Sequence, residues 1–217
     1  MIKFEELGFT PGILKAIQEL GFEQPMPVQE KVIPLMLAEG GDIIALAQTG
    51  TGKTAAFGLP LVQMTDTELS YTQALILCPT RELCMQITGD LTDYARYTGK
   101  LRILAVYGGA SIDNQIRELK KGVHIIVATP GRLIDLIGRR AAKLNAVKTV
   151  ILDEADEMLN MGFLDSINEI LEEVPAGRRT LLFSATMSAE IAGIAKRYME
   201  NAKEITIGTK NASAENV

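Results

Sequence analysis

Cysteine, histidine and tryptophan are scarce in this 217-residue sequence, which holds two cysteines, one histidine and no tryptophan. Cys78 and Cys84 have no histidines beside them, so they define neither a zinc site nor a disulfide framework. The single His124 lies in a β-rich run, which favours a structural role over a catalytic one. No apolar run approaches the ~18 residues of a membrane span, and the start MIKFEELGF lacks the apolar stretch of a secretory signal. These absences favour a cytoplasmic protein.

Positive charge is also in short supply, since 22 Lys and Arg face 27 Asp and Glu, a net charge of −5. This balance argues against a surface that binds nucleic acid by charge alone. Any such contact must be local and made by a few placed groups. Hydrophobic residues make up 47% and charged residues 23%, which suits one large domain with a sizeable core.

Short apolar runs rich in β-formers alternate with amphipathic segments, an alternation typical of an α/β fold. The expected strands are Asp42–Ala47, Gln73–Cys78, Arg102–Tyr107, His124–Ala128, Lys148–Leu152, Thr180–Phe183 and Glu204–Ile207. Helical patterns cover Pro11–Leu20, Val28–Ala38, Arg81–Tyr97, Ile112–Lys120 and Phe163–Glu173, and another helix starts near Lys53. Strands that are apolar throughout are buried on both faces, and helical crossovers make them parallel. The sequence therefore predicts a mostly parallel sheet of about seven strands with helices on both faces.

We expect one domain over residues 1–207, with two N-terminal helices within 1–40. Residues 208–217 are polar and small and lack periodicity, so a linker or tail is expected there.

The segment AQTGTGKT lies between an expected strand and an apolar helix, the context that a phosphate-binding loop requires. It comprises Ala47, Gln48, Thr49, Gly50, Thr51, Gly52, Lys53 and Thr54. The two glycines let backbone N–H groups turn towards phosphate oxygens, and the helix N-terminus adds its positive dipole end. Lys53 is expected to reach the β- and γ-phosphates, and the Thr54 hydroxyl to ligate Mg²⁺. The general pattern opens with glycine, where this sequence has Ala47.

A second signal, the run DEAD at residues 153–156, directly follows an expected strand. Carboxylates at the carboxyl ends of parallel strands lie where α/β folds bind ligands. Asp153 is expected to hold Mg²⁺ through its water shell, and Glu154 to orient and deprotonate the attacking water. Ser184 and Thr186, in the run SAT, follow another strand and could both bond Asp156, which would tie nucleotide state to the rest of the molecule. A short acidic cluster alone is more often a helix cap, and SAT alone a simple turn.

Together these motifs resemble those of the DEAD-box RNA helicases, over nearly the whole chain. The resemblance implies a RecA-like phosphate-loop domain. GFEQPMPVQ, residues 21–29, is similar to the family's adenine-recognising Q motif, with Phe4 at its upstream aromatic position. It implies that Gln29 bonds the adenine edge, to which an amide offers both donor and acceptor, and that Phe22 packs on the ring. Met26 stands where the family usually has a small hydroxyl residue, so a weaker contact with the phosphate loop is expected.

Three further matches to the family each follow an expected strand. They are Pro79, Thr80 and Arg81 in PTREL, the doublet Gly108 and Gly109, and Thr129, Pro130, Gly131 and Arg132 in TPGR. The resemblance implies that all three contact the RNA sugar–phosphate backbone, which carries no base information. Arg81 and Arg132 suit phosphate, and Thr129 and the Gly109 amide suit close backbone approach. Sequence-independent RNA binding by few cations is therefore implied, although PTREL alone is more often a helix start.

The resemblance implies an ATP-dependent RNA helicase that uses ATP and Mg²⁺, with Lys53, Asp153 and Glu154 as its catalytic residues. Family members also carry a second RecA-like domain that supplies arginine fingers, and none is expected after Ile207. Such a finger contributes about 10³–10⁵ in rate. We therefore expect this chain alone to be a monomer that binds adenine nucleotide weakly, hydrolyses ATP barely and does not unwind RNA. An RNA-clamping module without turnover, or another phosphate-loop nucleotide hydrolase, are the alternatives.

Overall fold

The computed structural model describes residues 1–38 and 40–208 and contains one sheet of seven strands, all paired in parallel. The strands are β1 (Ile43–Leu46), β2 (Ala74–Leu77), β3 (Ile103–Val106), β4 (Ile125–Ala128), β5 (Thr149–Leu152), β6 (Arg179–Ser184) and β7 (Lys203–Thr206). Their order across the sheet is β3-β4-β2-β5-β6-β1-β7. The predicted sheet is confirmed, and each expected strand agrees with the observed one to within a residue at either end.

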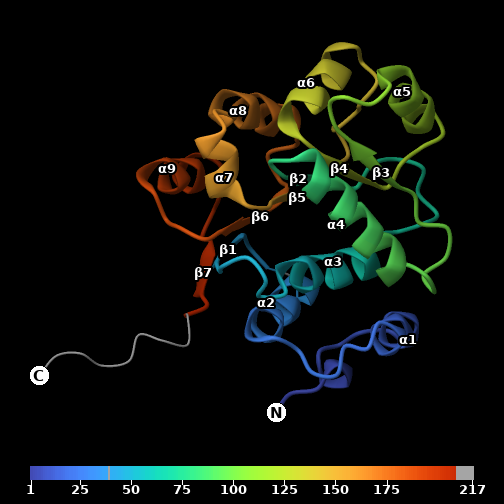
Figure 1. Ribbon diagram of the computed structural model, residues 1–217, viewed down its shortest axis with the longest axis vertical. Coiled ribbons are helices and arrows are strands. Elements are labelled where there is room, and N and C mark those ends of the chain that lie inside the picture. The colour runs from blue at the N-terminus through green and yellow to red at the C-terminus, as the bar shows by residue number, and fades with distance from the viewer. Residues whose placement is uncertain (39, 209–217) are drawn as a thin grey trace, which may run out of the picture.

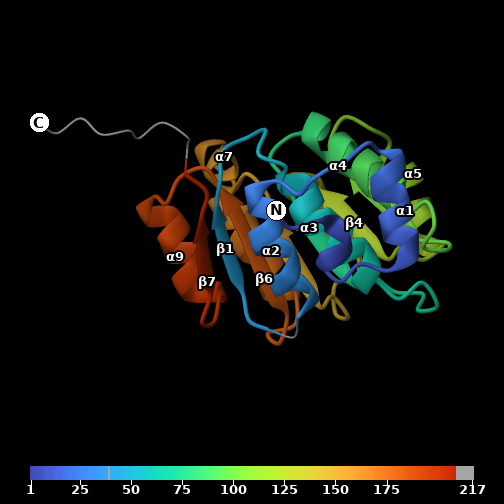
Figure 2. The same ribbon diagram turned by 90° about the horizontal axis from the view of Figure 1, so that it is seen from below.

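Helices cover both faces of the sheet, in two groups that follow from the handedness of the crossovers. The first group is α1 (Pro11–Glu19), α2 (Pro27–Leu37), α3 (Lys53–Met64) and α4 (Arg81–Tyr94). The second is α5 (Ile112–Lys120), α6 (Pro130–Gly138), α7 (Ala155–Asn160), α8 (Leu164–Glu173) and α9 (Ala189–Tyr198). From β1 to β3 the chain moves towards one edge of the sheet, and from β3 to β7 it moves back. Right-handed crossovers then place α3 and α4 on one face and α5 to α9 on the other (Figures 1 and 2). α1 and α2 precede β1 and pack in the layer of α3 and α4.

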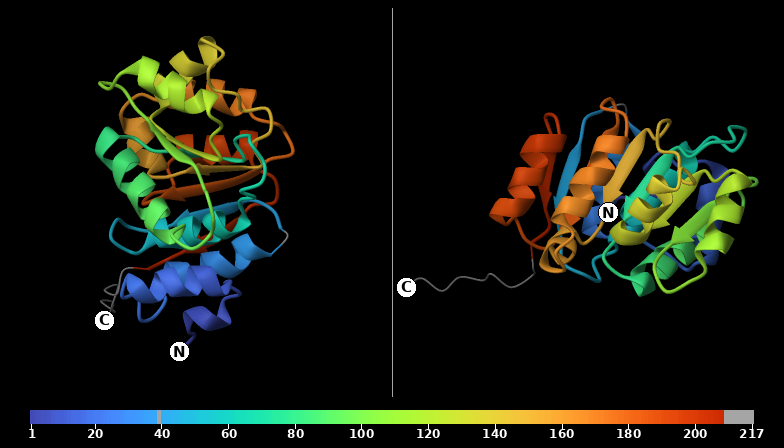
Figure 3. Two further views of the ribbon diagram at one scale, coloured as in Figure 1. Left: turned by 90° about the vertical axis from the view of Figure 1, so that its right-hand side faces the viewer. Right: turned by 90° about the horizontal axis from the view of Figure 1, so that it is seen from above.

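The core is divided by the sheet into two apolar layers. One joins residues of α1 to α4 to alternate residues of the strands, among them Phe57, Phe183 and Ile76. The other joins the second group of helices to the remaining strand residues, among them Leu75 and Leu152. Figure 3 shows the second group against its face of the sheet. Because both faces are covered, the strands are apolar throughout, which is what made them readable in the sequence.

One predicted boundary was wrong by more than a residue. The helix expected to reach Tyr97 ends at Tyr94, because the chain turns there: the Thr98 N–H bonds the Ala95 carbonyl at 3.0 Å and Gly99 has φ +88°.

The N-terminal helices are attached to the sheet through the helices that they cover. α2 packs along α3, and α1 lies beside α4. Tyr97 and Arg96, just past α4, both bond the Glu19 carboxylate at the end of α1. The linker or tail expected over 208–217 lies, apart from Gly208, outside the described residues.

Within the described ranges, no helix is both long enough and apolar enough to cross a membrane.

Candidate functional site

Six motif segments follow six parallel strands and therefore share one rim of the sheet. The strand order separates them into two neighbouring regions. The phosphate loop after β1, the acidic run after β5 and SAT at the end of β6 belong to the adjacent strands β5, β6 and β1. The PTREL, glycine-doublet and TPGR segments belong to the adjacent strands β2, β3 and β4. The rim thus carries a nucleotide region and, beside it, a region formed by the segments that resemble RNA contacts.

The phosphate loop has the backbone that its sequence requires. Gly50 and Gly52 adopt φ +77° and +85°, in the left-handed region that favours glycine. The Thr51 hydroxyl donates to the Gln48 carbonyl at 2.7 Å and closes the turn. Lys53 begins α3 and is buried. Its Nζ lies 3.9 Å from Asp153 Oδ1, so the loop and the acidic run face each other.

Asp153 is the most strongly perturbed acid of the site. Burial raises its pKa to about 6, Lys53 opposes this rise, and the neighbouring Glu154 adds to it. Asp153 Oδ1 accepts the Glu154 N–H at 3.0 Å. Glu154 has φ +49°, an uncommon value for a residue with a side chain. Such strained backbone is often found at functional sites and here marks the turn from β5 into α7.

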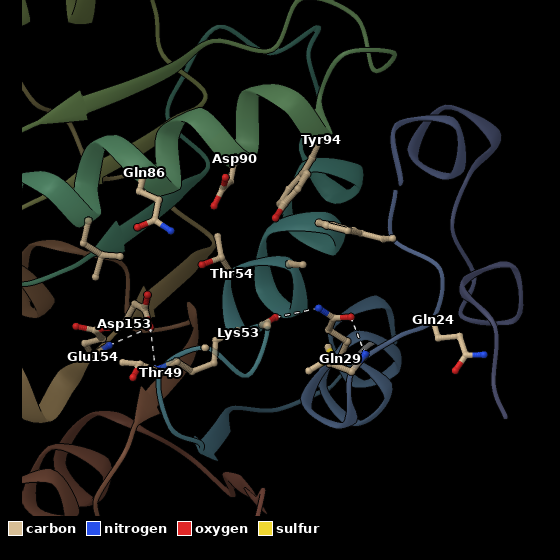
Figure 4. A pocket seen from close by; sticks show the side chains of 16 residues that line it. Gln24, Gln29, Thr49, Lys53, Thr54, Gln86, Asp90, Tyr94, Asp153 and Glu154 are labelled. Atoms are coloured by element: carbon tan, nitrogen blue, oxygen red, sulfur yellow. Dashed lines mark hydrogen bonds and ion pairs between the residues drawn. The ribbon is translucent and has the colours of Figure 1, made fainter. Parts of the chain in front are cut away.

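A cleft of about 580 Å³ extends from Lys53 and Asp153 towards the N-terminal segment (Figure 4). It is lined by Phe22, Gln24, Met26, Gln29, Thr49, Gly50, Gly52, Lys53, Thr54, Ala55, Leu83, Gln86, Asp90, Tyr94, Asp153 and Glu154. Of the predicted loop residues, Ala47 is buried, and Ala47, Gln48 and Thr51 lie outside the lining. The rest of the loop lines the cleft.

Sequence reasoning missed one wall of this cleft, which α4 provides. Leu83, Gln86, Asp90 and Tyr94 recur every three or four residues and so share a helix face. Figure 4 shows the last three pointing into the cleft, opposite Thr54. Burial and, to a smaller extent, Asp93 raise the pKa of Asp90. The spacing of these polar residues on an otherwise apolar helix face was the available signal.

The predicted Q-motif glutamine contacts the phosphate loop directly. Gln29 is 5% exposed; its Oε1 accepts the Met26 N–H at 2.9 Å, and its Nε2 donates to the Gly52 carbonyl at 3.2 Å. Gln29 therefore provides a hydrogen bond between the Q motif and the phosphate loop that does not depend on the side chain of Met26. One N–H and one lone pair of the amide are not used by these two bonds. Gln29 is one of the residues that line the cleft.

Phe22 lies at the far end of the cleft, 36% exposed. Its ring centroid is 6.4 Å from that of Phe4, in a stacked arrangement, and 6.4 Å from that of Tyr94, edge-on. The exposed face of this aromatic group offers a planar apolar surface beside Gln29.

The SAT segment only partly matches its expected contacts. The Thr186 hydroxyl donates to Asp156 Oδ2 at 3.3 Å. The Ser184 hydroxyl instead donates to the Thr186 carbonyl at 2.7 Å, so the prediction that both hydroxyls bond Asp156 was wrong. Because Ser184 is the last residue of β6 and is buried, its side chain holds the turn and cannot also reach the acidic run.

The second region of the rim combines exposed and internal groups. Arg81 is exposed and lies 5.0 Å over the Tyr107 ring. Thr80 caps α4 by accepting the Leu83 N–H at 3.2 Å. Gly108, Gly109 and Gly131 are exposed, Pro79 and Pro130 are buried, and Thr129 is half-buried. Arg132, which was expected to be free for phosphate, directs its Nη1 inwards to the Ala110 carbonyl (2.9 Å) and to Gln115 (3.1 Å).

The cleft has ligands suited to Mg²⁺. Among the described residues no group of three or more His, Cys, Asp or Glu side chains could hold a metal by itself. Mg²⁺ usually keeps several waters and binds through one or two carboxylates together with substrate phosphates. Thr54 and Asp153 provide hard oxygen donors beside the phosphate loop, so the residues fit this ion.

Fold and cleft together define a phosphate-loop α/β nucleotide-binding domain. The model of the DEAD/DEAH box helicase family matches residues 26–194. This chain belongs to that family.

Relatives and solved structures agree with the family. An ATP-dependent RNA helicase CshA from Listeria monocytogenes is 53% identical over 99% of this chain and 41% of that protein. A DEAD-box ATP-dependent RNA helicase CshA from Geobacillus kaustophilus is 49% identical over the whole chain and 46% of that protein. The crystal structure of a DEAD box protein from Methanococcus jannaschii superposes with a TM-score of 0.91 at 45% identity, covering 95% of this chain and 56% of that one. The chain thus spans less than half the length of these two helicase relatives.

Proposed function

We propose that this chain is the ATP- and RNA-binding domain of an ATP-dependent RNA helicase. The 3.9 Å approach of Lys53 Nζ to Asp153 Oδ1 carries the proposal, because it brings a phosphate-binding cation and a magnesium-binding carboxylate to one cleft. The names of the relatives, which are RNA helicases dependent on ATP, support both ligands. The proposed domain is residues 1–207, with 208–217 leading into a linker.

Each nucleotide-site residue has a proposed role. Lys53 neutralises the β- and γ-phosphates, together with the backbone N–H groups of the loop and the N-terminus of α3. Thr54 and Asp153 hold Mg²⁺, which supplies charge neutralisation at the phosphates when bound. Glu154 takes the proton from the attacking water. Gln29 reads the adenine edge with its unused N–H and lone pair, while Phe22 supports the ring.

RNA is proposed to bind along the neighbouring region of the rim, after β2, β3 and β4. Arg81 is exposed there, and the exposed glycines permit close approach of a sugar–phosphate backbone. Contacts of this kind read no bases, so binding should be independent of sequence. They also let a chain with a net charge of −5 bind RNA through a few placed groups.

In the whole protein, a second RecA-like domain is proposed to close over both regions. ATP and RNA would each favour the closed state, so each raises the affinity for the other. Glu154 would act only in that state. A monomer in the cytoplasm remains our prediction for the location and assembly.

The test is a nucleotide panel with matched variants. Calorimetry should show ADP and ATP binding more tightly than GDP and GTP, and Gln29→Leu should remove this preference. In the whole protein, Glu154→Gln should abolish RNA-stimulated phosphate release and spare nucleotide binding. Equal affinity of the wild type for guanine and adenine nucleotides would contradict the proposal, as would full turnover by the Glu154→Gln protein.

A further inference from the structure

Gln115 is a buried amide beside the second region of the rim. It lies in the first turns of α5, 6% exposed, in a helix that Ser111 caps by accepting the Asn114 N–H. Both ends of its side chain are bonded. Nε2 donates to the Tyr107 carbonyl at 3.1 Å, and Oε1 accepts from Arg132 Nη1 at 3.1 Å. A buried amide with both ends bonded holds its neighbours in a defined geometry, because losing either bond leaves a polar group unpaired.

Arg132 extends this network to the other end of the same turn. Its Nη1 also donates to the Ala110 carbonyl at 2.9 Å. The turn between β3 and α5 is therefore held at its first residue by Gln115 and at its last by Arg132, and these two side chains bond each other. Between them lie Gly108 and Gly109, both exposed, the latter with φ +84°. A glycine pair samples many backbone conformations when nothing restrains it.

The same turn lies beside the exposed Arg81. The Arg81 guanidinium lies 5.0 Å over the ring of Tyr107, within the range of a cation–π interaction. A Cβ placed on Gly109 would come 3.5 Å from Arg81 Nη1, so the guanidinium lies next to the turn. The segments after β2, β3 and β4 are thus connected through residues 107–110. Gln115 is the buried residue at the centre of this connection.

We propose that Gln115 is a positioning residue for RNA binding, which holds the turn at residues 107–110 in the conformation that receives the sugar–phosphate backbone. This rests on the proposed function, because it concerns how the same rim binds RNA. Gln115 does not touch RNA. By holding the turn and Arg81 in place before RNA arrives, it lowers the entropic cost of ordering them on binding. Arg132 acts with it from the inside of the turn, as a second positioning residue.

The experiment compares RNA affinity and its salt dependence in four variants. A fluorescein-labelled single-stranded oligouridylate is titrated with the protein at several KCl concentrations, and binding is followed by anisotropy. Gln115→Leu keeps the size of the side chain and loses both bonds; we expect the dissociation constant to rise about tenfold at every salt concentration. The slope of log affinity against log salt should not change, because no phosphate contact is removed. Arg81→Met should flatten that slope by about 0.7, the value for one phosphate on a single strand.

Arg132→Met tests the shared action of the pair. We expect it to behave as Gln115→Leu does, and the double variant to bind only slightly more weakly than either single one, because all three release the same turn. Thermal midpoint and ADP affinity serve as fold controls, and Gln18→Leu, at an exposed glutamine of α1, is the matched substitution. If Gln115→Leu does not fold, Gln115→Glu takes its place. This variant keeps the acceptor for Arg132 and loses the donor to the Tyr107 carbonyl. It should weaken RNA binding without changing the slope of log affinity against log salt.

The outcomes separate the inference from the proposed function. A wild-type protein that does not bind oligouridylate contradicts RNA binding itself. A wild type that binds, with a folded Gln115 variant within twofold of it, overturns the positioning role alone. A flattened salt slope in the Gln115 or Arg132 variants also overturns it, since that would show direct phosphate contact. The positioning role is supported if the Gln115 and Arg132 variants bind RNA more weakly than the wild type, with the same slope of log affinity against log salt and the same ADP affinity.

Discussion

Lys53 Nζ lies 3.9 Å from Asp153 Oδ1, with the two side chains only 7% and 3% exposed. The distance is at the long limit of an ion pair. The attraction between the two charges therefore does not fully offset the free energy lost when both are buried. The remaining cost is visible in the Asp153 pKa, which burial raises to about 6 despite the lysine. A cation and a carboxylate held apart in this way can each accept a further partner. An anionic phosphate and a hydrated Mg²⁺ are the partners that fit.

Replacing the lysine tests this relationship. Lys53→Met should weaken ADP and ATP binding by more than about tenfold, because one direct cation–phosphate contact is worth at least the 1.4 kcal/mol of that factor. It should also raise the Asp153 pKa further above its ordinary value, since Lys53 lowers that pKa more than any other group does. Calorimetric titration measures the first effect. Lys143→Met, at an exposed lysine far along the chain, should change neither. Unaltered nucleotide affinity in Lys53→Met would remove the cleft as the nucleotide site.

The two glycines of the phosphate loop offer a matched pair of substitutions. Both have positive φ, so alanine at either costs about 1 kcal/mol or more in backbone strain. At Gly52 the added Cβ would also lie 2.6 Å from Gln29 Nε2, whereas at Gly50 it meets nothing within 4 Å. Gly52→Ala should therefore lower the thermal midpoint of the nucleotide-free protein more than Gly50→Ala does. It should also reduce the preference for adenine, because Gln29 is displaced. Equal thermal midpoints for the two variants would contradict this prediction, because they would show that the Gln29 side chain moves aside without loss of stability.

The sheet could be predicted because each strand is apolar, short and followed by a polar motif. Runs such as Ala74–Leu77 and Thr149–Leu152 are buried on both faces, so their composition alone identifies them. The shared rim of Lys53 and Asp153 could be predicted for a related reason. Parallel strands bring every segment that follows them to one rim, so strand assignment already places the segments of Lys53 and Asp153 on the same rim. How close they lie there depends on the strand order, which comes from the structure.

What could not be predicted depends on side-chain contacts between elements. The direction of Arg132 is one example, because a motif match names a residue without saying whether it points to solvent or to a carbonyl inside. Ser184 is another, since its hydroxyl is used by the turn that it begins. The α4 wall of the cleft depends on the packing of α4 against α3, so the spacing of its residues could indicate a shared helix face but not what that face lines. Contacts between residues distant in sequence carry no periodic signal.

His124 gives the protein a pH dependence with a defined sign. It is solvent-inaccessible, and its Nδ1 accepts the Arg102 N–H at 2.9 Å, which requires an unprotonated Nδ1. Burial and the nearby Arg102 lower the His124 pKa below 6.5 in the folded protein. The unfolded chain then binds the proton more readily, so the free energy of unfolding falls as the pH drops through 6.5 towards the folded value. His124→Asn, which keeps an acceptor and does not titrate, should show a shallower loss between pH 7 and pH 5 in urea unfolding. Identical pH slopes would exclude His124 as the source.

Arg179 at the start of β6 holds the end of α2. Its guanidinium donates to the carbonyls of Leu35, Met36 and Ala38, and also to that of Gly41. These include carbonyls in the last turn of α2, which lack partners within the helix. A lysine keeps the charge but cannot direct donors to four acceptors. Arg179→Lys should therefore lower the free energy of unfolding by about 1–3 kcal/mol, the cost of leaving such groups unpaired.

The measurement for Arg179 is urea unfolding, with ADP affinity recorded beside it. Gln29 lies in the first turn of α2, at the end away from Arg179, and is bonded there to Met26 and Gly52. Loosening the last turn should lower the free energy of unfolding but change the free energy of ADP binding by less than about 0.4 kcal/mol. That corresponds to a change in ADP affinity of at most about twofold. Arg139→Lys, at an exposed arginine past the end of α6, is the matched control and should change neither quantity. A large loss of ADP affinity in Arg179→Lys would mean that α2 moves as a rigid unit and that its position, rather than its first turn, sets the adenine site.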